Sequence, residues 1–367
     1  MMAVAELHVA PSAAKSSLEI AEYTKRDLEA LLRDESFWMQ PRLPITKRRV
    51  VSQVANPRAD DNDTLLLTAH FKGQLVACLG VLPDQVKDPS QGRVKFGWLT
   101  AWWADKESEQ RLAAMKLLFM AMKRYANRLA ASSPASAAAS AYLNTGQFEE
   151  HGRCDRTYFI ISMSPSTGLP GRVVRSVAGV KNRWLYGRSA VRRELRVHIP
   201  DVFDAQMESF IDHQAQEDPF GRDSLYWNWA LRFPWMSSTD EDRVMQEKYT
   251  FSVFAGDFRQ IPMFVSRHGR IIAFLVMTLR DHRLTLKHAY YDPADVTDVT
   301  AAVRSAVAEI NPWLFVCGDA GIDARLRRGF PFYLARKARH SAIYATKTLP
   351  RLPWSRPQPG SGDSLFT

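Results

Sequence analysis

The fold is decided by a short stretch that occurs twice in the chain. Lys72-Gly73-Gln74-Leu75-Val76-Ala77 in the first half has a counterpart, His268-Gly269-Arg270-Ile271-Ile272-Ala273, in the second. In both copies a glycine suited to a tight turn is followed by apolar residues typical of a strand, and an apolar arm precedes the turn. Each copy therefore predicts a β-hairpin. A hairpin repeated in this way indicates that two similar structural units make up the chain.

An aromatic strand and a long helix follow each hairpin. Ala101-Trp102-Trp103-Ala104-Asp105 matches Ala289-Tyr290-Tyr291-Asp292-Pro293, and both stretches contain an acidic residue just after the paired aromatics. Apolar residues then recur at steps of three and four, which predicts a helix from near Leu112 in one half and from near Val296 in the other. Each half next offers a strand, a short helix and a last strand, at 141–143, 147–151 and 156–162 and at 313–317, 322–328 and 341–346.

The remaining segments divide the chain into domains. We expect a helix at 18–33 before the first copy; a helix at 202–214 and then the aromatic-rich string 223–230 precede the second. The Ala/Ser-rich stretch 132–140 predicts a helix end or a flexible loop. The predicted domains are 1–165 and 201–348, with a basic connector at 166–200 and a Pro/Gly-rich, loosely held tail at 349–367.

Composition excludes several classes of protein. With 46% hydrophobic and 24% charged residues in 367, the chain is globular and long enough for two domains. The first thirty residues lack the apolar core of a signal peptide, and no apolar run is long enough for a membrane span, so we expect a soluble, cytoplasmic protein with no membrane partner. Three widely spaced cysteines and the histidine spacing predict buried thiols and no metal site.

The net charge of +10 is concentrated in two segments. Residues 172–196 and 322–351 each hold eight Lys/Arg and one acidic residue, so each carries +7. Such segments can be solvated faces, can hold the phosphates of a substrate or can contact nucleic acid. The stretch Arg183-Trp184-Leu185-Tyr186-Gly187-Arg188 interleaves arginines with aromatics as single-strand binders do. No nucleic-acid fold signature accompanies it, which disfavours a nucleic-acid partner.

The order of elements resembles that of the GNAT (N-acetyltransferase-like) superfamily, in a tandem arrangement. The resemblance rests on the repeated hairpins, on the acidic residue after the aromatic strand, and on Leu326-Arg327-Arg328-Gly329-Phe330, which is similar to the end of the family's short helix. The string Tyr226-Trp227-Asn228-Trp229 before Pro234 is similar to one found in some GNAT-like proteins. The resemblance implies an α/β (α+β) fold with two domains in tandem, each a mixed central sheet flanked by helices.

The resemblance also implies a binding site for acetyl-CoA or another acyl-CoA as co-substrate. In the family the pyrophosphate sits on amides at the start of the long helix, where small residues allow close approach. The residues implied at this place in the first half are Gln110, Arg111, Ala113 and Ala114. The family's glycine pattern is incomplete there, because Ala113 and Met115 occupy its two small positions. The second half has only Asp295 and Asp298 in place of a phosphate loop, so the first half is favoured as the donor site.

Candidate catalytic residues follow from the chemistry of acyl transfer, which needs a general base and an acid for the departing thiolate. Asp105 and Glu107, after the aromatic strand, are the candidate bases, although acidic residues before a helix also serve as caps. Tyr142, beside the predicted strand 141–143, is the candidate acid, and Asn144 can orient substrate or water. Tyrosines on apolar strands are more often core residues. His288 is a candidate for titration near neutrality, but a lone histidine is more often a satisfied surface or core residue.

Three functions are consistent with this sequence. The first is an acyl-CoA-dependent N-acyltransferase (acetyltransferase) acting on an amine of a small metabolite or sugar. The second is a catalytically decayed GNAT-like module that binds a ligand or partner. The third is a Fem-like aminoacyltransferase that takes aminoacyl-tRNA. The acceptor, the acyl group and the oligomeric state, a homodimer included, stay open.

Overall fold

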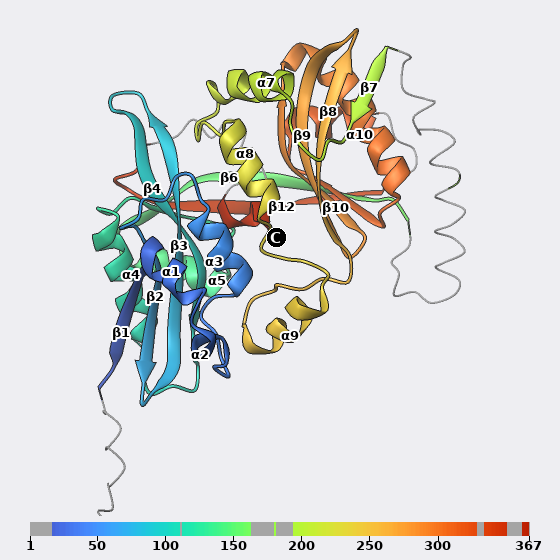
Figure 1. Cartoon of the computed structure of the whole chain (residues 1–367). Helices are drawn as coiled ribbons and strands as arrows, with labels where there is room; N and C mark the ends of the chain where they lie inside the picture. Colours follow the sequence, from blue (N-terminus) through green and yellow to red (C-terminus); the bar gives the residue numbers. More distant parts are fainter. Residues whose placement is uncertain are drawn as a thin grey trace, which may run out of the picture.

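A computed structural model describes residues 17–110, 112–162, 180, 194–328, 334–350 and 362–366. Two halves lie side by side, each with strands and covering helices (Figure 1). The first half contains β1 (Glu19–Thr24), α1 (Lys25–Leu31), α2 (Glu35–Trp38), α3 (Lys47–Val54), β2 (Thr64–Phe71), β3 (Gln74–Asp88), β4 (Gly92–Ala104), α4 (Ala113–Arg124), β5 (Leu129–Ser132), α5 (Ser136–Asn144) and β6 (Phe148–Ile160). The second half contains β7 (Leu195–His198), α7 (Ala205–Ala215), α8 (Ser224–Arg232), α9 (Asp240–Lys248), β8 (Phe258–Arg267), β9 (Arg270–Arg280), β10 (Arg283–Tyr291), the 3-10 helix η3 (Pro293–Asp295), α10 (Val296–Ile310), β11 (Leu314–Cys317), α11 (Ala320–Arg328), β12 (Leu334–Thr346) and the 3-10 helix η4 (Gly362–Phe366).

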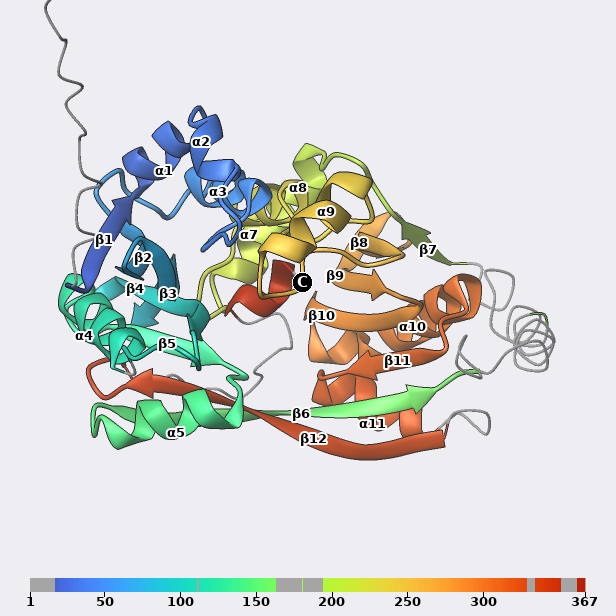
Figure 2. The ribbon, with the colours of Figure 1, turned by 90° about the horizontal axis from the view of Figure 1, so that it is seen from below.

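The mixed sheets of the two halves join into one sheet of twelve strands. Its order is β1-β2-β3-β4-β5-β12-β6-β11-β10-β9-β8-β7. The last strand of each half is therefore exchanged: β12 pairs with β5 of the first half, and β6 pairs with β11 of the second. These two long strands also pair with each other and cross from one half to the other (Figure 2). Neither half completes its own sheet.

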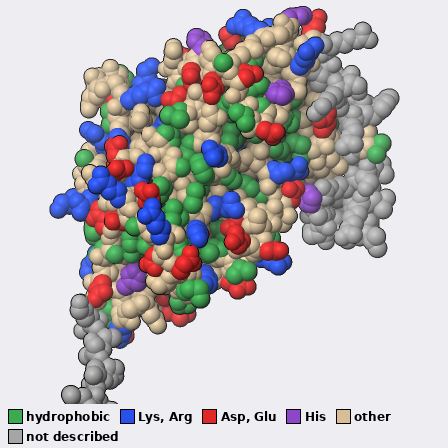
Figure 3. Space-filling view, in the orientation of Figure 1, with side chains coloured by type: hydrophobic (Ala, Val, Ile, Leu, Met, Phe, Trp, Pro, Cys, Tyr) green, Lys and Arg blue, Asp and Glu red, His purple; other side chains and the backbone are tan. Residues whose placement is uncertain are grey.

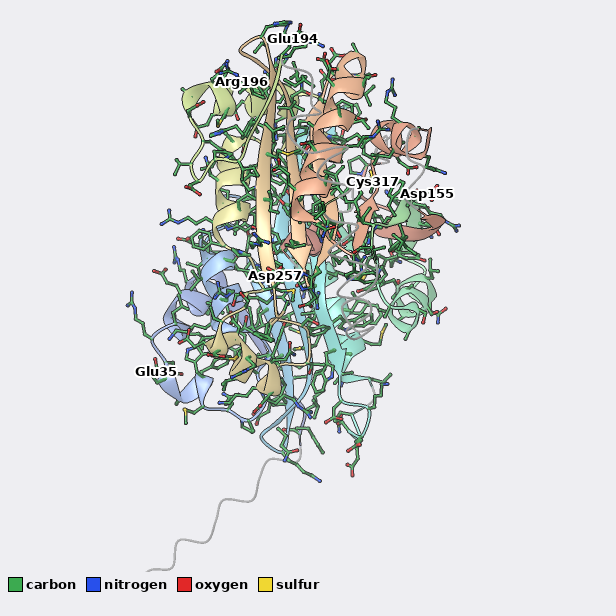
Figure 4. The ribbon with its side chains drawn as sticks, turned by 90° about the vertical axis from the view of Figure 1, so that its right-hand side faces the viewer. Glu35, Asp155, Glu194, Arg196, Asp257 and Cys317 are labelled. Carbon is green, nitrogen blue, oxygen red and sulfur yellow. The ribbon has the colours of Figure 1, made fainter. Side chains whose placement is uncertain are left out.

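Helices cover both faces of this sheet. Side chains of α4 pack on one face of the first half, and side chains of α10 pack on the same face of the second. Helices α7 and α8 pack on the opposite face, which Figure 4 shows with α7 and α8 on one side of the strands and α10 on the other. Helix α3 joins α8 on that face, because Trp229 Nε1 of α8 donates to the carbonyl of Ser52 over 2.7 Å. None of the described helices is long and apolar enough to cross a membrane.

The structure confirms the repeated order predicted from the sequence. The two predicted hairpins are β2–β3 and β8–β9, the aromatic strands are β4 and β10, and the long helices are α4 and α10. The helix predicted at 202–214 is α7, and the string 223–230 begins at the N-cap of α8. The predicted burial of the thiols is confirmed for Cys78 and Cys317, the latter labelled on β11 in Figure 4.

Three local predictions are wrong. The predicted helix at 18–33 begins as strand β1 and becomes helical only after Thr24, which accepts a hydrogen bond from Asp27 N and caps α1. Tyr142 lies in helix α5, not on a strand, because the Ala/Ser-rich residues before it continue helically. The predicted short helix at 147–151 is part of β6, since this segment pairs with β12.

A buried ionic network joins the two halves near the centre. Arg58 pairs with Asp84, and their side chains are 6% and 2% exposed. Asp84 also accepts a hydrogen bond from Trp98 Nε1 over 2.9 Å, and Arg58 Nη2 donates to the carbonyl of Gly221 in the second half over 2.7 Å. Gly221 has φ +52, and a Cβ there would lie 1.9 Å from Nη1 of Arg93. The left-handed φ at this position favours glycine.

The described end of the predicted tail is also held between the halves. Helix η4 packs against β4, β5 and α8, and its Leu365 and Phe366 are fully buried. Its backbone carbonyls accept hydrogen bonds from Lys287 Nζ, Gln260 Nε2 and Trp235 N over 2.6, 3.2 and 3.0 Å. The prediction of a loosely held tail is thus wrong for 362–366. The sequence hid this packing because few apolar residues among prolines and glycines carry it.

We predict that Phe366→Ala destabilises the whole protein. The Phe366 ring stacks on Trp235 at 4.7 Å between centroids, and truncating a buried phenylalanine costs about 3–5 kcal/mol. Urea unfolding followed by circular dichroism should show this loss. Leu225→Ala, on the exposed side of α8, is the matched control and should leave the midpoint within error. An unchanged midpoint for Phe366→Ala would contradict the packing described here.

Candidate active site

The neighbouring strands β4 and β5 separate after a short contact. They run parallel but pair only at Gly97–Leu129 and Trp98–Ala130. On its other edge β5 pairs with β12 through Ala130, Ala131 and Ser132. The sheet of the first half is therefore split at this point. A small apolar cavity of about 10 Å³, room for one water molecule, adjoins the last pair and is lined by Trp98, Ala130 and Phe220 among others.

Strand β4 is irregular immediately beyond the end of this pairing. Its register against β3 shifts between Cys78 and Gly80, and Ala101 opposite has φ +49, which an alanine rarely adopts. The carbonyl of Ala101 faces the thiol of Cys78 at 3.6 Å. The second half repeats the arrangement, since β10 is irregular between Leu286 and His288, just after its parallel pairing with β11 ends at Thr285.

The N-terminus of α4 differs from that of α10 in charge. Helix α4 has no side-chain cap and no acidic residue in its first turn, and Leu112 at its N-cap position is 69% exposed. Helix α10 has Asp295 and Asp298 at its start, and both pair with Arg267 over 2.9 and 2.7 Å. In the described first turn of α4 no acidic side chain compensates the helix dipole, whereas Asp295 and Asp298 already do so at α10.

The split of the second half is also closed by its own side chains. Tyr291 at the end of β10 donates a hydrogen bond to Asp319 at the start of α11, over 2.5 Å. Asp319 in turn accepts from Ile322 N, and a Cβ at Gly321 would lie 2.7 Å from the Tyr291 hydroxyl. The Tyr291–Asp319 hydrogen bond therefore bridges the end of β10 and the start of α11.

Asp105 and Glu107, the predicted bases, occupy one turn after β4. Asp105 Oδ1 accepts from Glu107 N over 3.1 Å, and its Oδ2 pairs with Arg42 Nη1 over 3.2 Å. The Arg42 guanidinium lies over the Trp103 ring at 4.9 Å. Asp105 thus shapes the turn, and Glu107 is exposed. Neither residue caps α4, which starts at Ala113.

Tyr142 and Asn144 both come from helix α5. Tyr142 is 2% exposed and stacks between Trp102 and Phe148, with centroid distances of 5.0 Å to each. Trp102 belongs to β4 and precedes Asp105 by three residues. The stack therefore places Tyr142 beside this end of β4. Asn144 is the last residue of α5 and is exposed. Asp105 and Glu107 form the turn after β4, and Tyr142 stacks on Trp102 just before it. Asn144 has no described contact with this turn.

The residues implied at the pyrophosphate surround the start of α4. Gln110 N donates to Ser108 Oγ over 3.1 Å, and the Gln110 carbonyl accepts from Ala113 N over 2.9 Å. Ala113 is 1% exposed and belongs to the core below the helix, whereas the carbonyl of Ala114 accepts from Trp102 Nε1 over 3.1 Å. Arg111 lies outside the described residues. The basic segments 172–196 and 322–351 are described only in part, and Figure 3 shows Lys, Arg, Asp and Glu intermixed over the described part of one face.

Sequence reasoning missed the residues on the other face of the split. Trp98 and Thr100 face α3 and α8, and Arg49 Nη2 of α3 donates to Thr100 Oγ1 over 3.1 Å. Helix α3 was not expected, because its sequence is polar and basic along most of its length. A Thr46 cap before this segment was the available signal for a helix start.

His288 is buried in the second half and is 5% exposed. Its ring packs on Trp227 at 4.6 Å and on Tyr290 at 4.3 Å between centroids. Burial lowers the pKa of His288 to about 3; the charge of Asp218 opposes this shift and that of Arg222 adds to it. The histidine is therefore neutral in the folded protein at neutral pH, so it does not titrate there.

Comparisons with known proteins agree with this geometry. No family model and no curated protein matches the chain. Among solved structures, a protein of Enterococcus faecalis V583 described as a "Probable N-Acyltransferase" has a TM-score of 0.52 at 10% identity, covering 89% of this chain and 72% of that one. A GCN5-related N-acetyltransferase of Anabaena variabilis has a TM-score of 0.51 at 10% identity, with coverages of 89% and 72%. Saccharomyces cerevisiae N-myristoyltransferase with bound myristoyl-CoA has 0.50 at 11%, with coverages of 92% and 80%. The chain therefore has a GNAT-like fold in two mixed, helix-flanked halves.

We predict that His288 makes the protein less stable in mild acid. In the unfolded chain a histidine titrates near 6.5, whereas in the folded protein the pKa is lowered to about 3. Its contribution is fully present above pH 6.5 and is lost as the pH falls toward 3, by about 1.4 kcal/mol per pH unit. Urea unfolding at about pH 7 and about pH 5 should show a smaller loss for His288→Leu than for the wild type. The exposed His268→Leu serves as control, and equal losses in all three proteins would refute the prediction.

Proposed function

We propose that this protein is an acyl-CoA-dependent N-acyltransferase whose donor site is the β4–β5 split of the first half. The observation that carries the proposal is the contrast between the two halves. The first half combines a split sheet with a helix N-terminus free of acidic side chains, as a pyrophosphate needs. In the second half Arg267, Asp295 and Asp298 occupy the equivalent helix start.

The residues at the start of α4 fit such a donor. Leu112 is exposed, and its side chain carries no charge that would repel a phosphate. Gln110 precedes it and Ala114 follows it at the start of α4. Acyl-CoA would supply the activated thioester when bound.

The catalytic assignments remain part of the proposal. Glu107 is exposed and held by its backbone to Asp105, so it is the better placed of the two carboxylates to accept a proton from an amine. Asp105, paired with Arg42, orients the turn. Tyr142 has less support as the acid because it is enclosed in the stack with Trp102 and Phe148. Asn144 has the least, because it lies exposed at the helix end.

Acetyl-CoA binding is expected to depend on the charge at the start of α4. Leu112→Glu adds a carboxylate that suits the helix dipole, so it should not unfold the protein, but it repels a pyrophosphate. Calorimetry should show micromolar binding to the wild type and at least tenfold weaker binding to Leu112→Glu.

The matched control is Thr297→Glu in the first turn of α10, which is exposed and should leave binding unchanged. Absence of heat with millimolar acetyl-CoA, or equal weakening by the two variants, would overturn the assignment of the donor site. RNA retention without acetyl-CoA binding would favour the aminoacyl-tRNA alternative instead.

A further inference from the structure

Helix α3 presents two polar side chains to the protein interior. Arg49 is 6% exposed and Gln53 is 1% exposed. Their spacing of four residues places them on the same face of the helix. Ser52, between them, is satisfied, since its carbonyl and hydroxyl accept from Trp229 Nε1 and Trp235 Nε1 over 2.7 and 2.9 Å.

Arg49 is a buried cation without a carboxylate partner among the described residues. Its Nη1 donates to the Tyr249 hydroxyl over 2.6 Å and its Nη2 to Thr100 Oγ1 over 3.1 Å, but its Nε has no acceptor. The guanidinium lies 3.9 Å from the centre of the Trp235 ring. Arg58, buried to the same degree, pairs with Asp84. An uncompensated buried charge is costly, so a counter-charge is expected at Arg49.

Gln53 adds two further polar atoms with no partner. Neither its Nε2 nor its Oε1 has a hydrogen bond among the described residues, although both are buried. Buried amides in folded proteins are normally paired with protein, water or a ligand. Together with Arg49 Nε, three unpaired polar atoms therefore lie on one face of α3.

The position of these side chains relates them to the candidate active site. Arg49 reaches Thr100, two residues beyond the last β4–β5 pair at Trp98. Alternation along the strand places Thr100 on the face of Trp98, opposite α4. A donor whose pyrophosphate lies at α4 would bring its acyl end through the split toward this face. Trp235, which lies under Arg49, also stacks on Phe366 of η4.

We propose that Arg49 and Gln53 bind a carboxylate of the acceptor, so that the acceptor is an amine of the amino-acid class. This inference rests on the proposed acyltransferase function. The buried, unpaired Nε–H of Arg49 and the unpaired Nε2 of Gln53 are donors that a planar carboxylate would satisfy. A single carboxylate neutralises the single charge of Arg49, whereas a phosphate dianion would leave a buried negative charge. The carboxylate holds the acceptor amine beside the β4 irregularity at Ala101.

The test uses product-like probes and needs no acyl-CoA. N-acetyl-L-amino acids with different side chains are compared with their amides by calorimetry and thermal shift. The acids differ from the amides only in the carboxylate. We expect at least one acid to bind with at least tenfold higher affinity than its amide.

Variants then assign the binding to this site. Arg49→Met and Gln53→Leu should each lower the affinity for the acid tenfold or more and leave the amide unchanged. Arg49→Lys retains the charge and tests the fork geometry if Arg49→Met fails to fold. Lys47→Met, on the exposed side of α3, is the matched control and should bind as the wild type does.

Three outcomes would overturn the inference. No acid binds at millimolar concentration, an acid and its amide bind equally, or folded Arg49 and Gln53 variants retain the preference for the acid. Failure of the donor site would appear separately, as loss of acetyl-CoA binding in the calorimetry with Leu112→Glu and Thr297→Glu.

Discussion

The exchange of β6 and β12 between the halves is the constraint on which the rest of the structure depends. Strands β4 and β5 share two residue pairs only, so β5 stays in the sheet because β12 of the other half pairs with it. Likewise β11 pairs with β6 through four residues, Leu314 to Cys317. A sheet held by these crossing strands can open between its parallel strands without falling apart. The exchange therefore keeps β5 in the sheet on the far side of the split that defines the candidate donor site.

The exchange also brings polar groups of both halves into a shared interior. The Arg58–Asp84 pair and the backbone of Gly221 join the halves on one side of Trp98, and η4 fills the interface nearby. Breaking such a pair would leave a buried charge uncompensated, so these contacts fix the relative position of the halves rather than add much net stability. Arg49 differs because no carboxylate among the described residues forms a salt bridge with it. We therefore propose that the Arg58–Asp84 pair holds the site in shape, and that the guanidinium of Arg49, which has no salt bridge, binds the ligand.

The two halves have diverged in charge while keeping one architecture. Both have a strand irregularity just beyond the parallel pairing and a long helix after the aromatic strand. In the second half Arg267 and the carboxylates at the start of α10 satisfy one another, and Tyr291 closes on Asp319. Because carboxylates already lie at the start of α10, its helix dipole no longer favours an anion there. We therefore propose donor binding in the first half and supporting contacts in the second.

Much of the fold was predictable from the sequence, because hairpin turns and helical periodicity are local signals. The helix at 18–33 was wrong because Leu18, Ala21 and Leu28 fit a helical period, although Thr24 and Asp27 carried the signal of a helix start. Strand exchange, the burial of η4 and the cluster of Arg49 with Gln53 depend on contacts between residues far apart in the chain. Tyr142 and Asp105 were proposed from the sequence pattern, whereas Thr100 and Arg49 were not, since the contact between these two is visible only in the folded protein.

The central claim is that the first half alone binds the donor, and hydrogen–deuterium exchange with saturating acetyl-CoA tests it most directly. The account predicts slower exchange in peptides covering 105–118, at the start of α4, and in β4 and β5, with no change in peptides covering 292–303. Slower exchange at the start of α10, or at both helix starts alike, would contradict it. So would unchanged exchange throughout the described part of the first half.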